Sequence, residues 1–112
     1  LTPDCGFYNA HKLMKRGCHV WMFEPGFHHT KIMMVDGKFC TLGSANLNAR
    51  SLKFDYEDNV IIVDPNTTGE MNRLFERDKK RSFLLTEERW NAWRTPWKKF
   101  VGWFAHLLAP VL

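Results

Sequence analysis

HTKIMMVDGKFCTLGSAN, residues 29–46, is the stretch from which the fold and the chemistry of this chain are best predicted. Residues 32–35 form an apolar run without polar alternation, which indicates a strand buried on both faces. Asp36-Gly37 is a strong hairpin signal, so a second strand is expected over residues 38–42. The stretch therefore predicts a strand, a tight turn and an antiparallel strand.

His29 and Lys31 stand two residues apart at the start of this hairpin, and such side chains on an extended chain point to the same side. An imidazole and an ammonium group that face one space suit a phosphate. Lysine supplies charge and donors, and histidine attacks phosphorus or passes a proton. Gly43, Ser44 and Asn46 follow the second strand. We therefore interpret the stretch as one half of a phosphodiester-handling active site.

These residues resemble the signature of the phospholipase D superfamily, HxKxxxxD followed after six residues by GS or GT and then xN. The longer stretch PGFHHTKIMMVDGKFCTLGSANLNARSL, followed by Glu57, is most similar to the second motif of bacterial cardiolipin synthases. The resemblance covers nearly the whole chain. It implies an α/β fold, namely part of a phospholipase D-like sandwich with a mixed sheet flanked by helices, one motif half and a C-terminal helical tail.

The resemblance implies a role for each residue of the motif. In the family one histidine attacks phosphorus to give a phosphohistidine, and a second, from another motif, protonates the departing alkoxide. His29 is one of these two, and because the upstream histidine more often attacks, His29 is a candidate proton donor. Lys31 and Asn46 would hold the non-bridging phosphate oxygens, and Ser44 would donate to the phosphate or its neighbours.

Two acidic positions complete the expected site. Glu57 matches the family's carboxylate that accepts from the histidine ring, with Asp55 and Asp58 as neighbours that could be confused with it. Asp36 belongs to the signature and is counted with the catalytic residues, although its Asp-Gly context favours a role in the turn. His28 is expected to face away from the site. The sequence contains no cluster of carboxylates that would indicate a metal site. A phosphate site made of lysine and amide donors needs no metal, and no cofactor is expected.

The rest of the chain is predicted to consist of further helices and strands, from helical periodicity, capping residues and proline or glycine stops. Helices are expected over residues 4–16, over 68–83, after Thr86 and from Pro96, and strands over 18–24 and 60–63. Residues 1–85 are assigned to the C-terminal portion of a phospholipase D-like catalytic domain. Residues 86–112 are assigned to an amphipathic, aromatic and basic helical tail.

The composition is that of one globular domain: 112 residues, of which 45% are hydrophobic and 25% charged. Cys5, Cys18 and Cys40 form no CxxC pair and have no ligand-spaced histidines, which argues against a disulfide framework or a zinc site and fits a cytoplasmic-type reducing environment. Cys18 and Cys40 lie in apolar runs and are expected in the core. The net charge of +4 favours anionic partners.

The last predicted helix, PWKKFVGWFAHLLA, is too short and too charged to span a bilayer. Its large apolar residues are expected along one side, namely Trp97, Phe100, Val101, Phe104 and Leu108. Two interpretations stay open for that side. It packs on the rest of the enzyme, which is preferred, or it lies in the membrane interface with its aromatic rings at headgroup depth.

The preferred functional hypothesis is phosphatidyl transfer by a cardiolipin synthase of two motifs, of which this chain supplies the second. The opening Leu1 and the flanks favour a first motif upstream in the same polypeptide over the pairing of two copies, and the isolated chain is expected to be inactive alone. A phosphatidylglycerol-like phospholipid and an anionic membrane surface are the expected partners. The protein would lie at the cell membrane, peripherally or through an anchor in the missing N-terminal part.

Two alternatives remain from the sequence. A homodimeric single-motif phosphodiesterase or endonuclease would use the same residues on nucleic acid, which is not a partner in the preferred hypothesis. An inactive lipid-binding fragment is the other.

Overall fold

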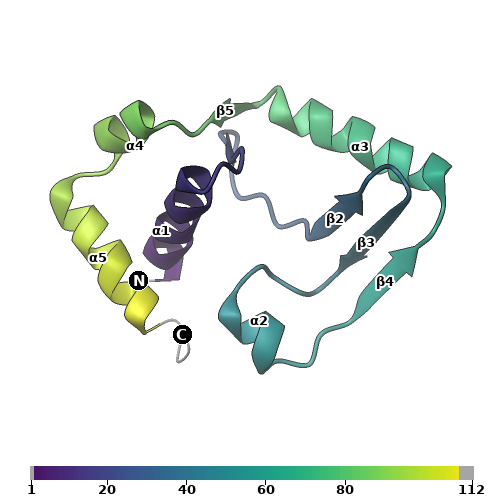
Figure 1. Cartoon of the computed structure of the whole chain (residues 1–112), viewed down its shortest axis with the longest axis horizontal. Helices are drawn as coiled ribbons and strands as arrows, with labels where there is room; N and C mark the ends of the chain where they lie inside the picture. Colours follow the sequence, from purple (N-terminus) through teal and green to yellow (C-terminus); the bar gives the residue numbers. More distant parts are fainter. Residues whose placement is uncertain (1, 109–112) are drawn as a thin grey trace. The chain divides into compact units, whose positions relative to one another are not determined.

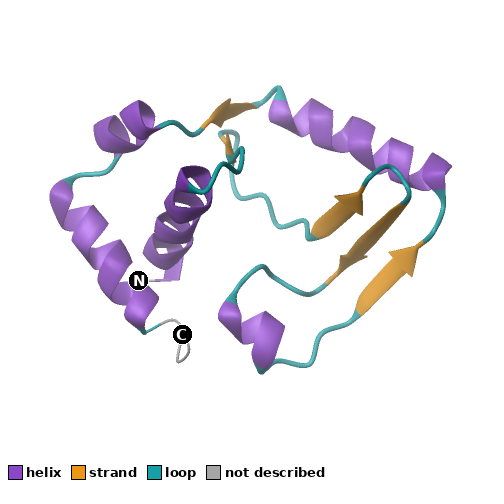
Figure 2. Cartoon of the chain, viewed as in Figure 1, coloured by secondary structure: helices purple, strands orange, loops and turns teal. Residues whose placement is uncertain are grey.

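The computed structural model describes residues 2–108 and has the predicted α/β class, with small antiparallel sheets flanked by helices (Figures 1 and 2). Its elements in chain order are α1 Thr2–Lys15, β1 Trp21–Phe23, β2 Ile32–Val35, β3 Phe39–Gly43, α2 Ala49–Lys53, β4 Asn59–Ile62, α3 Pro65–Lys79, β5 Ser82–Leu84, α4 Glu87–Trp93 and α5 Pro96–Leu107.

The chain forms two compact units. The central unit is Phe23–Ser82 and contains all of residues 29–46, and the terminal unit combines Leu1–Met22 with Phe83–Leu112. The expected functional division between residues 85 and 86 stays a prediction.

The predicted hairpin is confirmed at the centre of the central unit. Strands β2 and β3 are antiparallel, with Met34 opposite Cys40 and Val35 opposite Phe39. Asp36 and Gly37 both have positive φ, 51° and 66°. A type I′ turn requires positive φ at both central residues, and its twist matches the twist of the two strands. The amide of Lys38 closes the turn by donating to the carbonyl of Val35 at 2.9 Å.

Strand β4 completes a three-stranded sheet by pairing antiparallel with β3, and α3 packs against β2 and β3. Cys40 of β3 and Thr68 of α3 are fully buried. The expectation that residues 32–35 are buried on both faces is wrong, because Met33 is 55% exposed. Met33 shares its face of the sheet with Thr41 and Ile61, and within residues 2–108 that face stays largely open.

Helix α3 begins and ends earlier than predicted. Asp64 caps it by accepting from the amide of Thr67 at 2.8 Å, and Pro65 occupies its first turn, so the Asp-Pro pair starts a helix as well as ending a strand. Phe83, which was expected in this helix, belongs to β5, which pairs with β1. The serine hydroxyl of Ser82 donates to the carbonyl of Asp78 at 2.8 Å as the chain leaves the helix.

The terminal unit is built on the packing of α1 against α5. Gly102 allows this approach, since a Cβ there would lie 2.9 Å from the carbonyl oxygen of Asp4 and 3.3 Å from Cβ of Tyr8. Cys5 and Ala105 are buried in the same unit. Helix α5 therefore packs through its small residues, whereas Trp97, Phe100 and Phe104 of its large apolar side are exposed, so the preferred expectation that this side packs is wrong.

Threonine caps begin both C-terminal helices, as predicted. Thr86 accepts from the amide of Arg89 at 3.2 Å, and Thr95 accepts from the amide of Lys98 at 3.4 Å.

The two cysteines that were expected in the core differ in burial. Cys40 is buried as expected, but Cys18 is exposed, because β1 starts only at Trp21 and Cys18 lies in the segment between α1 and β1.

A buried guanidinium ties α4 to α1. Arg94 is only 5% exposed, and its Nη2 donates to Asp4 Oδ1 at 2.6 Å and to the carbonyl of Lys98 at 3.1 Å. The guanidinium also lies over the rings of Phe7 and Trp90. The hydrogen bond from Arg94 lowers the pKa of Asp4 below its ordinary value, so this carboxylate is charged in the folded protein.

We predict that Asp4→Asn destabilises the chain by about 2 kcal/mol at neutral pH, because it leaves the buried charge of Arg94 without a counter-charge. Since folding lowers the pKa of Asp4, the stabilisation is present above the ordinary carboxyl pKa and is lost as the pH falls through the folded value. Urea denaturation should therefore separate variant and wild type at pH 7 and bring them together in acid. Glu76→Gln, which removes an exposed pair with Lys79, is the control and should cost little.

Candidate active site

His29 and Lys31 meet just before β2. Both precede the strand, which starts at Ile32, so the predicted extension of the strand to them is wrong. Their convergence is nevertheless observed: Lys31 Nζ lies 2.5 Å from His29 Nδ1 and donates to the carbonyl of His29 at 2.9 Å. Because an ammonium group has only donors, Nδ1 is the accepting nitrogen in this contact. The imidazole is exposed and the lysine is half-buried.

The end of β3 lies beside this pair. The amide of Gly43 donates to the carbonyl of Lys31 at 3.3 Å, and the amide of Ser44 donates to the carbonyl of Asp58 at 2.9 Å. A side chain at Gly43 would overlap the strand next to it, since a Cβ there would lie 2.1 Å from the carbonyl oxygen of Asp58 and 2.7 Å from Cα of Asn59. Glycine at this position is therefore what lets the backbone following β3 run against the start of β4.

Ser44 and Glu57 form the second polar contact of the site. The hydroxyl of Ser44 donates to Glu57 Oε2, and accepts from the amide of Asp58 at 3.0 Å. The hydrogen bond from Ser44 lowers the pKa of Glu57, a hydrogen bond from Ser51 lowers it further, and the positive charge of Lys31 acts in the same direction. Partial burial and the charge of Asp55 oppose these effects. The pKa of Glu57 is therefore held below its ordinary value, and Lys31 is close enough to contribute to this.

Glu57 is distinguished from its acidic neighbours by these contacts. Asp55 pairs instead with Arg50, whose Nε lies 3.0 Å from Asp55 Oδ1. The expected hydrogen bond from the His29 ring to Glu57 does not occur within the described residues, where the carboxylate accepts from Ser44. The role of Glu57 in orienting the ring stays a prediction.

Two expected site residues lie apart from these contacts. Asp36 sits in the hairpin turn, at the opposite end of β2 from Lys31, which agrees with a structural role for it. Asn46 lies in the loop that leads into α2, where its carbonyl accepts from the amide of Asn48 at 2.9 Å. Its side chain is exposed. Asn48 itself caps α2 by accepting from the amide of Ser51 at 2.8 Å.

Neighbouring residues hold the segment that carries His29. His28 faces away from the site, as predicted, and its Nε2 lies 3.0 Å from Asp78 Oδ2 on α3. Phe23 contacts the His28 ring edge-on, with ring centroids 5.1 Å apart. Phe27 packs in the same way on His29 itself, at 5.3 Å. Sequence reasoning missed Ser51, Phe27 and Asp78. The orientation of His28 was predicted from strand alternation, but the strand begins only at Ile32, and it is the contact with Asp78 that holds this ring.

Residues 4–79 match the family model described as cardiolipin synthase, phospholipase D-like domain. The chain is 35% identical over 106 residues to cardiolipin synthase 1 of Staphylococcus epidermidis, covering 95% of the chain and 21% of that protein. It is 36% identical over 102 residues to cardiolipin synthase 1 of Bacillus anthracis, covering 89% of the chain and 19% of that protein.

A third relative is the cardiolipin synthase of Listeria monocytogenes, which is 33% identical over 103 residues, covering 92% of the chain and 21% of the relative. The chain thus spans about a fifth of the length of the curated relatives it matches, and the match falls in their C-terminal part. No solved structure matches the chain.

We predict that Gly43→Ala lowers the free energy of unfolding by at least about 2 kcal/mol, because backbone atoms of Asp58 and Asn59 must move to admit the methyl group. Gly69→Ala is the matched control. Gly69 lies inside α3 with nothing within 4 Å of the added Cβ, and the same change there should be neutral or stabilise by up to about 1 kcal/mol. Equal effects in urea denaturation would contradict the close approach at Gly43.

We also predict that Ser44→Ala raises the pKa of Glu57 towards its ordinary value, because it removes the donor that contributes most to the lowered value. A pH titration of the Glu57 side-chain carboxyl carbon by NMR measures this. Ser82→Ala removes a hydroxyl of the same unit that donates to a backbone carbonyl, and should leave Glu57 unchanged. An unaltered titration in Ser44→Ala would remove Ser44 as the partner of this carboxylate.

Proposed function

Because the chain belongs to the phospholipase D-like domain family of cardiolipin synthases, we propose that it supplies the second catalytic motif for phosphatidyl transfer between phospholipids. The observation that carries the proposal is the contact of Lys31 with the His29 ring, beside the carboxylate held by Ser44. A phosphodiester in this space would meet an ammonium donor, a hydroxyl donor and an imidazole at once. The first motif would come from the same polypeptide or from a second copy.

The proposed reaction has two displacements at one phosphorus atom. A histidine nitrogen attacks the phosphorus of phosphatidylglycerol, so that an N–P bond forms while the P–O bond to glycerol breaks. The other histidine gives its proton to the leaving glycerol oxygen. A hydroxyl of a second phosphatidylglycerol then returns a proton to that histidine, its oxygen attacks phosphorus, and the N–P bond breaks. The products are cardiolipin and glycerol.

Each residue of the motif has a part in this scheme. Lys31 would release its contact with the imidazole and donate to a non-bridging oxygen, where its charge offsets the charge that grows in the transition state. That exchange frees His29 Nδ1, which with a proton on it would donate to Glu57, a carboxylate whose pKa the charge of Lys31 helps to lower. Asn46 would add an amide donor to the phosphate. Asp36 would hold the hairpin turn.

His29 is proposed as the proton donor to the leaving group. A histidine titrates near neutral pH and serves as acid and base in turn. The cationic sequence, with a net charge of +4, suits a phospholipid substrate that carries negative charge and a position at the cell membrane.

We predict that the polypeptide encoded by the reading frame that contains this chain forms cardiolipin and glycerol from phosphatidylglycerol dispersed in detergent. His29→Ala should lower the rate by about 100-fold or more, since it removes one of two acid–base groups. His19→Ala, an exposed histidine of the terminal unit, is the matched control and should leave the rate unchanged. No transfer by the wild type, with no effect of His29→Ala, would favour the inactive fragment, and equal nonzero rates for the two proteins would remove His29 from the reaction.

A substrate with a better leaving group separates the two roles of histidine. Phosphatidyl-p-nitrophenol releases an oxyanion that needs no proton, so its cleavage survives His29→Ala if His29 is the acid. If cleavage is lost, His29 is the nucleophile. If the chain alone hydrolyses DNA and His29→Ala abolishes that activity, the result would instead support the single-motif phosphodiesterase.

A further inference from the structure

Helix α5 of the terminal unit turns its large apolar side chains outward. Its packing face is made of small residues, Gly102 and Ala105, which are buried against the unit. Its opposite face carries the exposed side chains that we name the aromatic stripe: Trp97, Phe100, Trp103, Phe104 and Leu107. These positions recur at helical spacing, and none of them is charged. In a helix that only served a core, this face would point inward.

The stripe is continuous. Trp97 and Phe100 stack with ring centroids 5.9 Å apart, and Phe100 and Trp103 follow at 5.8 Å. Trp97 is 71% exposed and Phe100 52%, so the rings rest on one another and on little else. Contiguous exposed apolar surface of this kind marks a binding surface.

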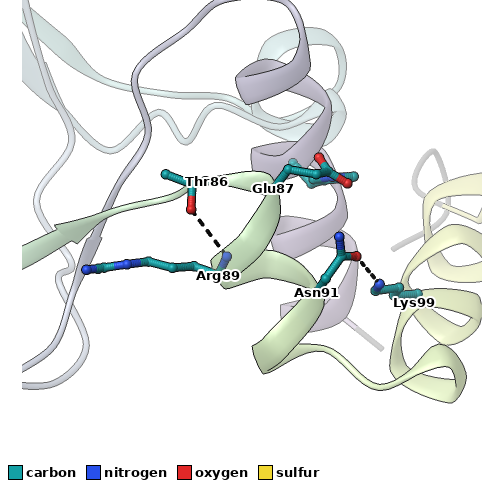
Figure 3. A network of polar contacts seen from close by, with 6 residues as sticks. Thr86, Glu87, Arg89, Asn91 and Lys99 are labelled. Carbon is teal, nitrogen blue, oxygen red and sulfur yellow. Dashed lines mark hydrogen bonds and ion pairs between the residues drawn. The ribbon is translucent and has the colours of Figure 1, made fainter.

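Polar contacts hold the helix in this orientation. Figure 3 shows Lys99 reaching back to Asn91 of α4, with Nζ 2.5 Å from Asn91 Oδ1, beside the Thr86 cap of that helix. On α1, Lys12 Nζ lies 3.3 Å from His106 Nε2. Lys99 and His106 are seven residues apart and therefore lie on the same side of α5. The aromatic stripe is therefore carried by a helix that polar contacts hold to α1 and α4.

Charge identifies the kind of partner. The sequence of the terminal unit holds seven lysine and arginine residues against three acidic ones, whereas residues 23–82 hold nine of each. The whole net charge of +4 thus belongs to the unit that carries the stripe. Helix α5 itself has Lys98 and Lys99 and no acidic residue. A second copy of the chain would bring the same positive charge and be repelled, while an anionic surface would be attracted.

We propose that the aromatic stripe of α5 is a docking surface for an anionic phospholipid bilayer, with the helix in the interface plane and the tryptophan rings at headgroup depth. Tryptophan suits this depth because its ring is apolar and its N–H is polar. No helix within residues 2–108 is long and apolar enough to cross a membrane, so this contact is with the surface of the bilayer. The inference adds a partner surface to the proposed function and stands without the chemistry of His29.

The experiment is flotation of the chain with vesicles of equal parts phosphatidylglycerol and phosphatidylcholine, and with vesicles of phosphatidylcholine alone. We expect binding to the anionic vesicles that weakens with added salt. Trp97→Ser/Phe100→Ser should weaken that binding by about tenfold or more, since two rings no longer enter the interface. Leu52→Ser/Phe54→Ser removes two similarly exposed apolar side chains from the central unit and should bind as wild type does.

A second variant keeps the apolar face intact. Lys98→Glu reverses an exposed charge and should weaken binding to anionic vesicles several-fold, with no such loss on neutral ones. Unchanged binding in the aromatic variant, or no binding of the wild type to anionic vesicles, would overturn the proposal. So would a wild-type dimer that fails to float and that the aromatic variant converts to monomer. His29→Ala should float like wild type, which keeps this outcome separate from the fate of the catalytic hypothesis.

Discussion

The close contact of the backbone after β3 with the start of β4 is the constraint on which the candidate site depends. Gly43 has no side chain, so the carbonyl of Asp58 can accept from the amide of Ser44 at 2.9 Å. This places the serine hydroxyl against Glu57, while the amide of Gly43 reaches back to Lys31. One glycine thus joins residues from three separate parts of the motif. A side chain there would push Ser44 away from Asp58 and Glu57, and the hydrogen bond from Ser44 is the main cause of the lowered pKa of that carboxylate.

The two compact units divide the charge of the chain unevenly. The central unit has equal numbers of acidic and basic residues, and pairs many of them locally, as Arg50 with Asp55 and Glu76 with Lys79. Under the proposed function such a unit would attract a phosphate by the local placement of Lys31 and not by its net charge. The terminal unit carries the net positive charge and the exposed aromatic helix. Chemistry and surface attraction are therefore separate properties that substitutions can change one at a time.

The sequence predicted best what local rules determine. Asp36-Gly37 defined the hairpin, and Thr86 and Thr95 defined two helix starts. It missed α2 and β5, which are five and three residues long and have too little periodicity to be recognised. It also missed the partner of Glu57, because a hydrogen bond across thirteen residues depends on how two loops meet and not on spacing.

Lys31 and Glu57, the two oppositely charged groups of the candidate site, both have hydrogen-bond partners within the described residues. Lys31 donates to the ring and carbonyl of His29, and Glu57 accepts from Ser44, so neither charge is left without a partner. Under the proposed function a phosphate would take Lys31 from the imidazole, and the ring nitrogen that accepted from it would need a new partner. A ring that carries a proton on Nδ1 would donate a hydrogen bond to a carboxylate, which is the hydrogen bond that the proposed acid catalyst requires.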